Sequence, residues 1–351
     1  MSSFFDRFFK DVGIDLGTAN TLIYVRDRGL AINEPSVAAV NNKTNQILAV
    51  GEDAKKMLGR TPGHITVVRP LVNGVISDFE MTREMLRQLL RRLTTTISPL
   101  ASYRRGILAI PNNLTEVERK SAEDAAIAAG CAKAFLIEQP IAAALGANLP
   151  IDTPTASLVI DIGGGTTGIA VISMGGTVNA RTLKTAGDKF DQDIIQFVRD
   201  EFKLVIGEPT AEFAKMAVGS AVPLDKSLEV PIRGRDMATG LPREVVIKNS
   251  HVRSALGKSL RTMSDAILET IETTPPELVG DMLKQGILIC GGGALLRGID
   301  VMIEKDTGGV AVQIAEDPLT CVVRGLGRMV DEFDGHRTLL DNPLRPLEIA
   351  L

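Results

Sequence analysis

The sequence predicts an α/β protein built from two similar halves, and three observations support this fold class. An apolar run, an aspartate, a turn of small residues and a second apolar run occur at 12–25 and again at 158–173. The two aspartates, Asp15 and Asp161, are 146 residues apart in a chain of 351 residues, a spacing suited to related halves. Elsewhere, apolar runs typical of strands alternate with amphipathic stretches typical of helices.

The composition excludes several classes of protein. With 44% hydrophobic and 23% charged residues, the chain is globular and long enough for about two or three domains. The net charge of −4 argues against nucleic acid as the main partner, because no basic surplus can neutralise its phosphates. The three cysteines lack metal-site spacing and are expected as buried thiols in a reducing cytosol. Isolated histidines predict no zinc site, and no apolar run is long enough to span a membrane.

The first ten residues predict a short amphipathic helix. At about 100° per residue, four phenylalanines fall within an arc of about 140°, opposite Asp6, Arg7 and Lys10. They are Phe4, Phe5, Phe8 and Phe9. Such an aromatic face suits the membrane interface, and the alternative is that the phenylalanines dock on the body of the protein. One segment binds lipid weakly, whereas many copies in an assembly bind firmly because later contacts become effectively intramolecular.

The stretch at 158–173 predicts a β-hairpin that holds a phosphate. Aliphatic residues on both sides of the turn form its strands. Between them, Gly163, Gly164 and Gly165 permit positive φ, so that consecutive amide N–H groups can converge on an anion. An ordinary glycine-rich hairpin is the alternative for this stretch taken alone.

Polar side chains around this turn suit a polyphosphate bound to magnesium. Thr166 and Thr167 offer hydroxyl donors, and Asp161 precedes the turn, where a carboxylate can hold Mg²⁺ through water. The stretch at 12–25 repeats the plan with Asp15, Gly17, Thr18, Ala19 and Asn20. Two such loops facing each other would pinch a polyphosphate. Neither loop has a Walker or dinucleotide-binding motif.

The remaining elements are expected in the following order. Short strands fill 30–51, helices follow at 52–59 and 81–97, a loop at 98–105 contains Leu100 and Tyr103, and a strand occupies 107–110. Thr115 and Glu118 form a capping box for a helix that ends at Gly130. A strand at 135–137 precedes helices at 141–148, 189–203 and 209–218. Strands fill 222–247 with turns at 233–234 and 239–240, and Ser250 caps a long helix. A strand, a glycine turn and a helix start follow at 286–298, and the last helix spans 318–333.

Together these motifs resemble the superfamily of actin, heat-shock chaperone and sugar-kinase ATPases, and within it the MreB/Mbl family of bacterial actins. The resemblance runs from the first residue to about residue 335. Its motifs are IDLGTANTLIYV, VERKSAEDAA, EQPIAAALGANLP, DIGGGTTGIAVIS, GDKFD, CGGGALLRGI and AEDPLTCVVRG. It implies an α/β, actin-like ATPase fold of two ribonuclease-H-like lobes, each with a smaller inserted subdomain.

The resemblance also implies a domain layout. A membrane-binding segment occupies 1–10. Lobe I occupies 11–147, with a small subdomain at about 33–65, and is completed by about 315–351. Lobe II occupies 148–314, with a small subdomain at about 185–245.

ATP and Mg²⁺ are the ligands that the resemblance implies, bound in the cleft. Asp15 and Asp161 then orient the hydrated metal, and the backbone of 17–20 and 163–165 holds the phosphates. Two sets of residues flank the adenosine. They are Glu212, Phe213, Ala214 and Lys215 on one side, and Gly292, Gly293, Ala294 and Leu295 on the other.

Two departures from the family pattern affect the expected hydrolysis. The family usually has glutamate directly before the proline, where this chain has Gln139, and the acid here is Glu138. Glutamine can orient the attacking water but does not readily take its proton. Gly168 stands where relatives usually carry an acidic residue or a histidine. With a catalytic set of Asp15, Glu138, Gln139, Asp161 and Thr166, slow hydrolysis gated by filament formation is expected.

The resemblance implies a cytoskeletal protein. ATP-bound copies of the chain assemble into filaments on the inner face of the cytoplasmic membrane and maintain rod shape through transmembrane cell-shape and wall-synthesis proteins. Another bacterial actin, which positions plasmids or organelles, is an alternative. A sugar or acid kinase would need a catalytic-base aspartate that no motif supplies, and a heat-shock regulator would need a further substrate-binding domain.

Overall fold

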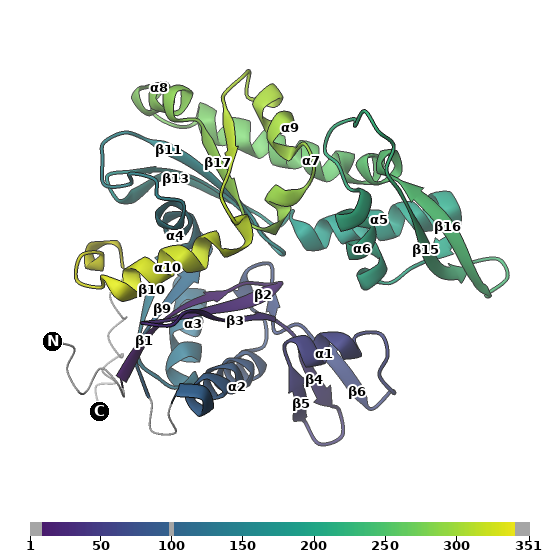
Figure 1. The fold of residues 1–351 in the computed structure, drawn as a ribbon, viewed down its shortest axis with the longest axis horizontal. Coiled ribbons are helices and arrows are strands. Elements are labelled where there is room, and N and C mark those ends of the chain that lie inside the picture. The colour runs from purple at the N-terminus through teal and green to yellow at the C-terminus, as the bar shows by residue number, and fades with distance from the viewer. Residues whose placement is uncertain (1–8, 98–101, 341–351) are drawn as a thin grey trace. The chain divides into compact units, whose positions relative to one another are not determined.

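The computed structural model describes residues 9–97 and 102–340. By its contacts the chain divides into two compact units. Unit 1 comprises the described parts of Met1–Thr153 and Thr320–Leu351, and unit 2 comprises Pro154–Leu319 (Figure 1). Each unit has its own central sheet and its own buried core. The subdomain boundaries expected from the sequence stay predictions.

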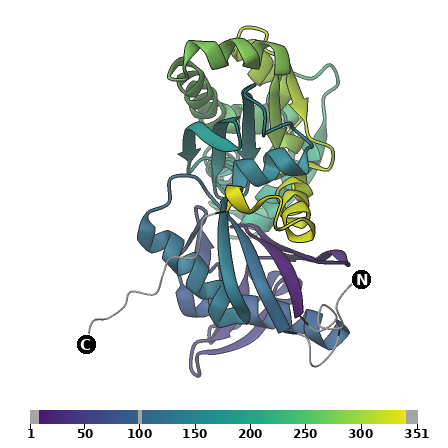
Figure 2. The same ribbon diagram turned by 90° about the vertical axis from the view of Figure 1, so that its left-hand side faces the viewer.

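The central sheet of unit 1 has five strands in the order β10-β9-β1-β2-β3. They are β1 (Phe9–Leu16), β2 (Asn20–Val25), β3 (Gly29–Pro35), β9 (Ser102–Ile110) and β10 (Cys131–Glu138). The first three form an antiparallel meander, and β9 and β10 join it in parallel. Figure 2 shows these strands side by side.

Helices and small sheets complete unit 1. Its helices are α1 (Glu52–Met57), α2 (Phe79–Ile97), α3 (Glu116–Ala129), α4 (Gln139–Gly146) and α10 (Cys321–Asp331). A three-stranded sheet contains β4 (Ala38–Asn41), β5 (Gln46–Val50) and β6 (Ile65–Val68), and β7 (Leu71–Val72) pairs with β8 (Val75–Ile76). Leucines of α2, fully or almost fully buried, pack with the apolar strand residues, so the central sheet and this helix share one core.

The central sheet of unit 2 repeats this topology in the order β13-β12-β11-β17-β18. Its strands are β11 (Ser157–Ile162), β12 (Thr167–Ser173), β13 (Gly176–Leu183), β17 (Ile287–Cys290) and β18 (Val312–Ile314). Again an antiparallel meander of three strands is followed by two parallel strands. Because β11 lies at the centre, it is buried along its whole length. The duplication expected from the two aspartate turns therefore extends to whole sheets.

The helices of unit 2 are α5 (Gly187–Phe202), α6 (Glu208–Val218), α7 (Asn249–Glu272), α8 (Pro276–Gln285) and α9 (Ile299–Asp306). A second sheet contains β14 (Leu204–Val205), β15 (Glu229–Asp236) and β16 (Pro242–Lys248). A 3₁₀ turn, η2 (Gly292–Leu295), follows β17. Among the described residues, no helix is both long and apolar enough to cross a membrane.

Two expectations near the amino end of β9 are wrong. Phe9 and Lys10 belong to strand β1, paired with Ser102 and Tyr103 of β9, so an amphipathic helix cannot extend to residue 10. Tyr103 lies in this strand rather than in a loop, is 4% exposed and donates its hydroxyl to the carbonyl oxygen of Leu90. Sheet pairing outweighs the local helical pattern at these positions. Phe4, Phe5, Phe8 and Leu100 lie outside the described residues.

The hairpin between β15 and β16 corrects a further expectation. Gly234 lies inside β15 and forms no turn; a Cβ there would lie 2.4 Å from the carbonyl oxygen of Val205, so glycine permits close approach of β14. The expected turn at 239–240 is present, with Gly240 at φ +73°. Ser250 lies within α7, whose N-cap position is occupied by Lys248. By contrast, the predicted capping box of Thr115 and Glu118 at α3 is confirmed.

Candidate functional site

Each unit contains the same turn between the first two strands of its central sheet. In unit 1 the amide of Gly17 donates to the carbonyl oxygen of Asn20 at 3.1 Å. In unit 2 the amide of Gly163 donates to the carbonyl oxygen of Thr166 at 2.9 Å. Each glycine follows its aspartate by two positions. The repeat predicted from the sequence thus holds at the level of individual hydrogen bonds.

The carbonyl groups of both turns are held by the segment that follows the third strand. Ser36 donates its hydroxyl to the Gly17 carbonyl at 2.6 Å. In unit 2 the amide of Gly187 donates to the Gly163 carbonyl at 3.1 Å, and the amide of Asp188 to the Gly164 carbonyl at 2.8 Å. Within the described residues, no backbone carbonyl accepts a hydrogen bond from the amides of residues 18, 19, 164 and 165. These four amides are therefore available to an anion.

The glycines of these turns are needed for close approach rather than for positive φ. None of Gly163, Gly164 and Gly165 lies in the left-handed region, contrary to the expectation from the sequence. A Cβ on Gly163 would lie 3.2 Å from the carbonyl oxygen of Thr166, and one on Gly17 would lie 2.7 Å from that of Asn20. The backbone folds so tightly across each turn that a side chain would crowd it.

Hydroxyl groups of both turns bond to the protein itself. Thr18 accepts a hydrogen bond from the amide of Gly74 at 2.9 Å, which joins the turn to the β7–β8 connection. Thr167 donates to the carbonyl oxygen of Thr185 at 2.7 Å, so it is not the phosphate donor expected from the sequence. Thr166 is half-buried in the turn. Ser36 and Gly74 were not singled out from the sequence, because they lie far along the chain from the turn that they support.

Gln139 is brought next to Asp15 in unit 1. Helix α4 begins at Gln139. The side-chain nitrogen of Gln139 donates to Oδ1 of Asp15 at 3.4 Å, which is a long and weak hydrogen bond. Glu138, at the end of β10, has a carboxylate oxygen 3.8 Å from the guanidinium of Arg119 in α3. Gln139, one of the two residues considered for the attacking water, is thus in contact with an expected metal-orienting carboxylate.

Asp161 is a buried carboxylate at the end of β11, with only 9% exposure. Burial raises its pKa to about 6, and a hydrogen bond from the Cys290 side chain partly opposes that shift. Gly168, which lies opposite Asp161 across the strand pair, contributes no side chain. A nearby cation would favour the ionised form of Asp161.

The donor set of these turns fits a hydrated Mg²⁺ ion. Among the described residues, no three or more His, Cys, Asp or Glu side chains are grouped as a metal cage. Mg²⁺ prefers hard oxygen ligands and keeps several waters, so single carboxylates such as Asp15 and Asp161 suit it. Each carboxylate lies three residues before the first of the amides that suit phosphate in its turn.

The two sets expected to flank the adenosine differ in their surroundings. On α6, Phe213 is 53% exposed, whereas Ala214 is fully buried in the core and its side chain cannot reach a ligand. On η2, Leu295 is 56% exposed and Ala294 is fully buried. A Cβ on Gly293 would lie 2.1 Å from Cγ2 of Ile162, so only glycine lets η2 pack against the end of β11.

Among the residues expected to flank the adenosine, Lys215 contacts other groups of unit 2. Nζ of Lys215 lies 2.9 Å from Oδ1 of Asp191 and donates to the Gly187 carbonyl at 3.0 Å. Burial raises the pKa of Asp191 to about 6, although the ammonium of Lys215 opposes this shift and Glu212 adds to it. Asp191 was not among the predicted residues. Its signal in the sequence is a charged residue on the apolar face of α5, beside the buried Phe190.

Comparison with known proteins places the chain among relatives of nearly equal length. The model of the family described as MreB/Mbl protein matches residues 9–338. Cell shape-determining protein Mbl of Bacillus subtilis (strain 168) is 45% identical over 327 residues, which cover 93% of this chain and 97% of that protein. Cell shape-determining protein MreB of Escherichia coli (strain K12) is 43% identical over 340 residues, 96% and 97% of the two chains.

Solved structures give the same result. The crystal structure of MreB5 of Spiroplasma citri bound to ADP has a TM-score of 0.88 at 39% identity, covering 95% of this chain and 99% of that one. The MamK double helical filament has a TM-score of 0.78 at 21% identity, covering 92% and 99%, and shows likeness of fold alone. These matches confirm the predicted actin-like α/β fold. The sequence and the fold agree that this chain belongs to the MreB/Mbl family.

Proposed function

We propose that this chain is an ATP-binding bacterial actin that forms filaments and acts in determining cell shape. The observation that carries the proposal is the turn that is repeated in both units. In each unit an aspartate precedes the turn, a glycine amide donates a hydrogen bond across it, and two further amides are available to an anion. Relatives at 43–45% identity are named cell shape-determining proteins. MreB5 of Spiroplasma citri binds ADP in one solved structure and AMPPNP in another, which supports a nucleotide as the ligand.

In this proposal the two turns hold the phosphates, and Asp15 and Asp161 orient Mg²⁺ through water. When bound, Mg²⁺ neutralises the charge that develops on the phosphates during hydrolysis. Gln139 orients the attacking water from its place beside Asp15. Because glutamine is a poor base, we propose slow hydrolysis that filament formation accelerates. Turnover by the monomer as fast as that of a metabolic kinase would contradict this part.

Filaments on the inner face of the cytoplasmic membrane form the second part of the proposal. A likeness in fold to the MamK filament supports self-association. The phenylalanines of residues 1–10 give each copy a weak lipid contact that assembly multiplies. We propose that the filaments act with transmembrane cell-shape and wall-synthesis proteins to maintain rod shape.

Sedimentation with anionic liposomes, ATP and Mg²⁺ tests both parts. The full chain is compared with a variant that lacks residues 2–8, so that strand β1 stays intact, and electron microscopy examines the pellets. We expect the pellets of the full chain to show ordered filaments on lipid, and the pellets of the shortened chain to show filaments that carry no lipid. Zwitterionic liposomes serve as the matched surface.

Each other outcome contradicts a stated part. If both the full and the shortened chain form filaments that do not bind liposomes, the proposed membrane association is contradicted. That result would favour a bacterial actin that positions plasmids or organelles. If neither variant binds ATP nor polymerises in any nucleotide, the proposal as a whole is wrong.

A further inference from the structure

Two buried hydroxyl groups lie behind the phosphate-binding turn of unit 1. Ser36, between β3 and β4, and Thr21, in β2, are both fully buried. Their side-chain oxygens lie 2.9 Å apart, and the Ser36 hydroxyl donates to the Gly17 carbonyl oxygen at 2.6 Å. Because neither side chain reaches the surface, its influence on a ligand must pass through the turn itself.

The direction of these hydrogen bonds follows from the number of available protons. A hydroxyl group carries one proton, and a carbonyl oxygen can only accept. The Ser36 proton is used on the Gly17 carbonyl, so Thr21 must donate to Ser36. Thr21 and Ser36 thus form a hydroxyl relay that ends on the Gly17 carbonyl. Successive hydrogen bonds of this kind polarise one another, and the buried setting strengthens each of them.

The hydroxyl relay ends on the peptide group that supplies the first amide available to an anion. The Gly17 carbonyl and the Thr18 amide belong to this one peptide group. In a planar trans peptide the C=O and N–H bonds point to opposite sides, so the Thr18 amide points away from Ser36. A hydrogen bond accepted by the oxygen of a peptide group polarises the group and makes its N–H a stronger donor.

The backbone of Ser36 holds the relay in place. The Ser36 amide donates to the Ala19 carbonyl at 2.9 Å, so this residue contacts the turn on both sides of Thr18. In unit 2 the carbonyl equivalent to that of Gly17 accepts from the backbone amide of Gly187. Unit 1 therefore uses side-chain hydroxyls where unit 2 uses backbone, and only the hydroxyls can be removed by substitution.

We infer that Ser36 and Thr21 are positioning residues for the phosphate-binding turn of unit 1, and that their hydroxyl relay strengthens the Thr18 amide as a donor to phosphate. This inference rests on the proposed nucleotide binding. The phosphates of the nucleotide gain from the relay, because it ends on the turn that holds them. Ser36 has the larger effect, since loss of Thr21 leaves the hydrogen bond from Ser36 to Gly17 in place.

The test compares ligands with and without phosphate. Dissociation constants for ATP, ADP and adenosine are measured with Mg²⁺ at protein concentrations where sedimentation shows monomers. For Ser36→Ala we expect ATP and ADP to bind roughly three- to tenfold more weakly, as loss of one neutral hydrogen bond predicts, and adenosine to change less than about twofold. Thr21→Val should weaken ATP and ADP by about two- to threefold. Thr21→Ser keeps the hydroxyl and should restore the affinity.

A double variant distinguishes a relay from two independent contacts. In a relay Thr21 acts only through Ser36, so Ser36→Ala with Thr21→Val should bind ATP as Ser36→Ala does. The double variant also leaves fewer buried polar groups unpaired, which keeps the test available should Ser36→Ala fold poorly. A second readout is the amide proton shift of Thr18 in the nucleotide-free protein, which should move upfield in both single variants and further in Ser36→Ala.

Ser264→Ala is the matched control for loss of a buried hydroxyl. Ser264 is also buried, and it donates its hydroxyl to Asp306 within unit 2. Its replacement should lower the free energy of unfolding and leave the affinity for all three ligands unchanged. A merely structural role of Ser36 would give the same pattern as this control.

Three results would overturn the inference. The first is an equal loss of affinity for adenosine and ATP in Ser36→Ala, which would mean that the whole site is disturbed. The second is an unchanged Thr18 amide shift together with unchanged ATP affinity. The third is a double variant whose loss is the product of the two single losses. If the wild type binds neither ATP nor ADP, the proposed function fails first, and this pattern differs from all three.

Discussion

At the residue scale, the space beside Asp161 depends on Gly291. This glycine has φ +78°, and a Cβ there would lie 2.5 Å from Oδ1 of Asp161 and 2.4 Å from the carbonyl oxygen of Ile162. Gly291→Ala combines left-handed strain with displacement of the carboxylate. We expect the free energy of unfolding to fall by about 3 kcal/mol or more, and ADP binding to weaken. Denaturant unfolding and calorimetric titration measure the two effects.

Gly308 provides the matched control for this prediction. It has φ +76°, but no atom lies within 4 Å of an added Cβ. Gly308→Ala should therefore cost only backbone strain, about 1–2 kcal/mol, and leave ADP binding unchanged. Equal losses of stability in the two variants would contradict the steric part of the argument.

Asp161 also predicts a dependence of stability on pH. Burial raises its pKa in the folded protein to about 6, above the ordinary 3.8, so the fold favours the neutral acid. As pH rises through this window, the folded state must carry a buried carboxylate and the free energy of unfolding falls. Asp161→Asn removes this cost. Without nucleotide, the variant should be more stable than the wild type by on the order of 1–3 kcal/mol above pH 6.

The gain from Asp161→Asn should vanish below about pH 4, where both folded and unfolded wild type are protonated. Urea unfolding at several pH values measures it. Asp161→Asn should also lose stabilisation by ADP with Mg²⁺, because the amide cannot orient the metal. A stability difference that stays constant from pH 4 to pH 8 would mean that ionisation of Asp161 is not its source.

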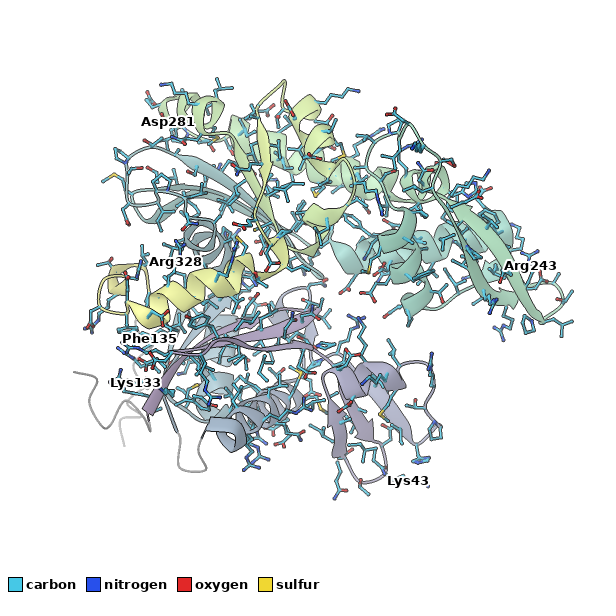
Figure 3. All side chains as sticks on the ribbon, in the orientation of Figure 1. Lys43, Lys133, Phe135, Arg243, Asp281 and Arg328 are labelled. Carbon is cyan, nitrogen blue, oxygen red and sulfur yellow. The ribbon has the colours of Figure 1, made fainter. Side chains whose placement is uncertain are left out.

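At the element scale, helix α4 is held against α10 by two facing glycines. A Cβ on Gly146 would lie 1.9 Å from the carbonyl oxygen of Cys321, and one on Gly325 would lie 1.8 Å from that of Ala142. Cys321 also donates its thiol to the carbonyl of Ala143 at 3.2 Å. Arg328 of α10, labelled in Figure 3, donates to the side chain of Asn148 just beyond α4. The backbones of the two helices are therefore in direct contact.

This contact positions Gln139, which begins α4. Gly325→Ala must push the helices apart, so we expect a loss of about 2–4 kcal/mol in the free energy of unfolding. ATP hydrolysis should fall on the order of tenfold or more, because Gln139 shifts relative to Asp15. Thermal unfolding and phosphate release measure these effects.

The control for Gly325→Ala is Gly257→Ala in α7. Gly257 is a helical glycine with no atom within 4 Å of an added Cβ. Its replacement should stabilise the protein by roughly 0.5–1 kcal/mol through helix propensity and leave hydrolysis unchanged. If Gly325→Ala behaves in the same way, the helices are not in contact as described.

At the scale of the whole molecule, the repeated sheets predict that both units respond to one ligand. Hydrogen exchange with and without ADP and Mg²⁺ should show added protection at residues 16–20 of unit 1 and 162–167 of unit 2. At about a thousandfold excess over the dissociation constant, the stabilisation is about 4 kcal/mol. Adenosine at the same saturation, which lacks phosphate, should protect neither turn. Protection confined to one unit would contradict a shared role of the two turns.

Much of the fold could be predicted because its signals are local. The apolar runs on each side of Asp15 and Asp161 became strand pairs, and Thr115 with Glu118 became a capping box, since each depends on neighbours in the sequence. Phe9 was misassigned because its conformation depends on pairing with β9, which lies more than ninety residues away in the sequence.

Prediction of the candidate site was less complete for the same reason. The aspartates and turn glycines are recognisable by type and spacing. Ser36, Asp191 and Gly291, by contrast, act through contacts with residues 19 to 130 positions away, which no local pattern records. The contacts of Lys215 with Asp191 and with the Gly187 carbonyl likewise join α6 to a helix 24 or more positions away in the sequence.

By itself the sequence determined the α/β fold class, the duplication and the kinds of groups that meet a phosphate, because periodicity and turn chemistry act over a few residues. Only the tertiary structure decided where these groups point. It holds the carbonyls of Gly163 and Gly164 on α5, buries Asp161 and engages Lys215 with Asp191. Such directions depend on packing between distant segments, whose geometry is settled only when the sheets and helices of each unit come together.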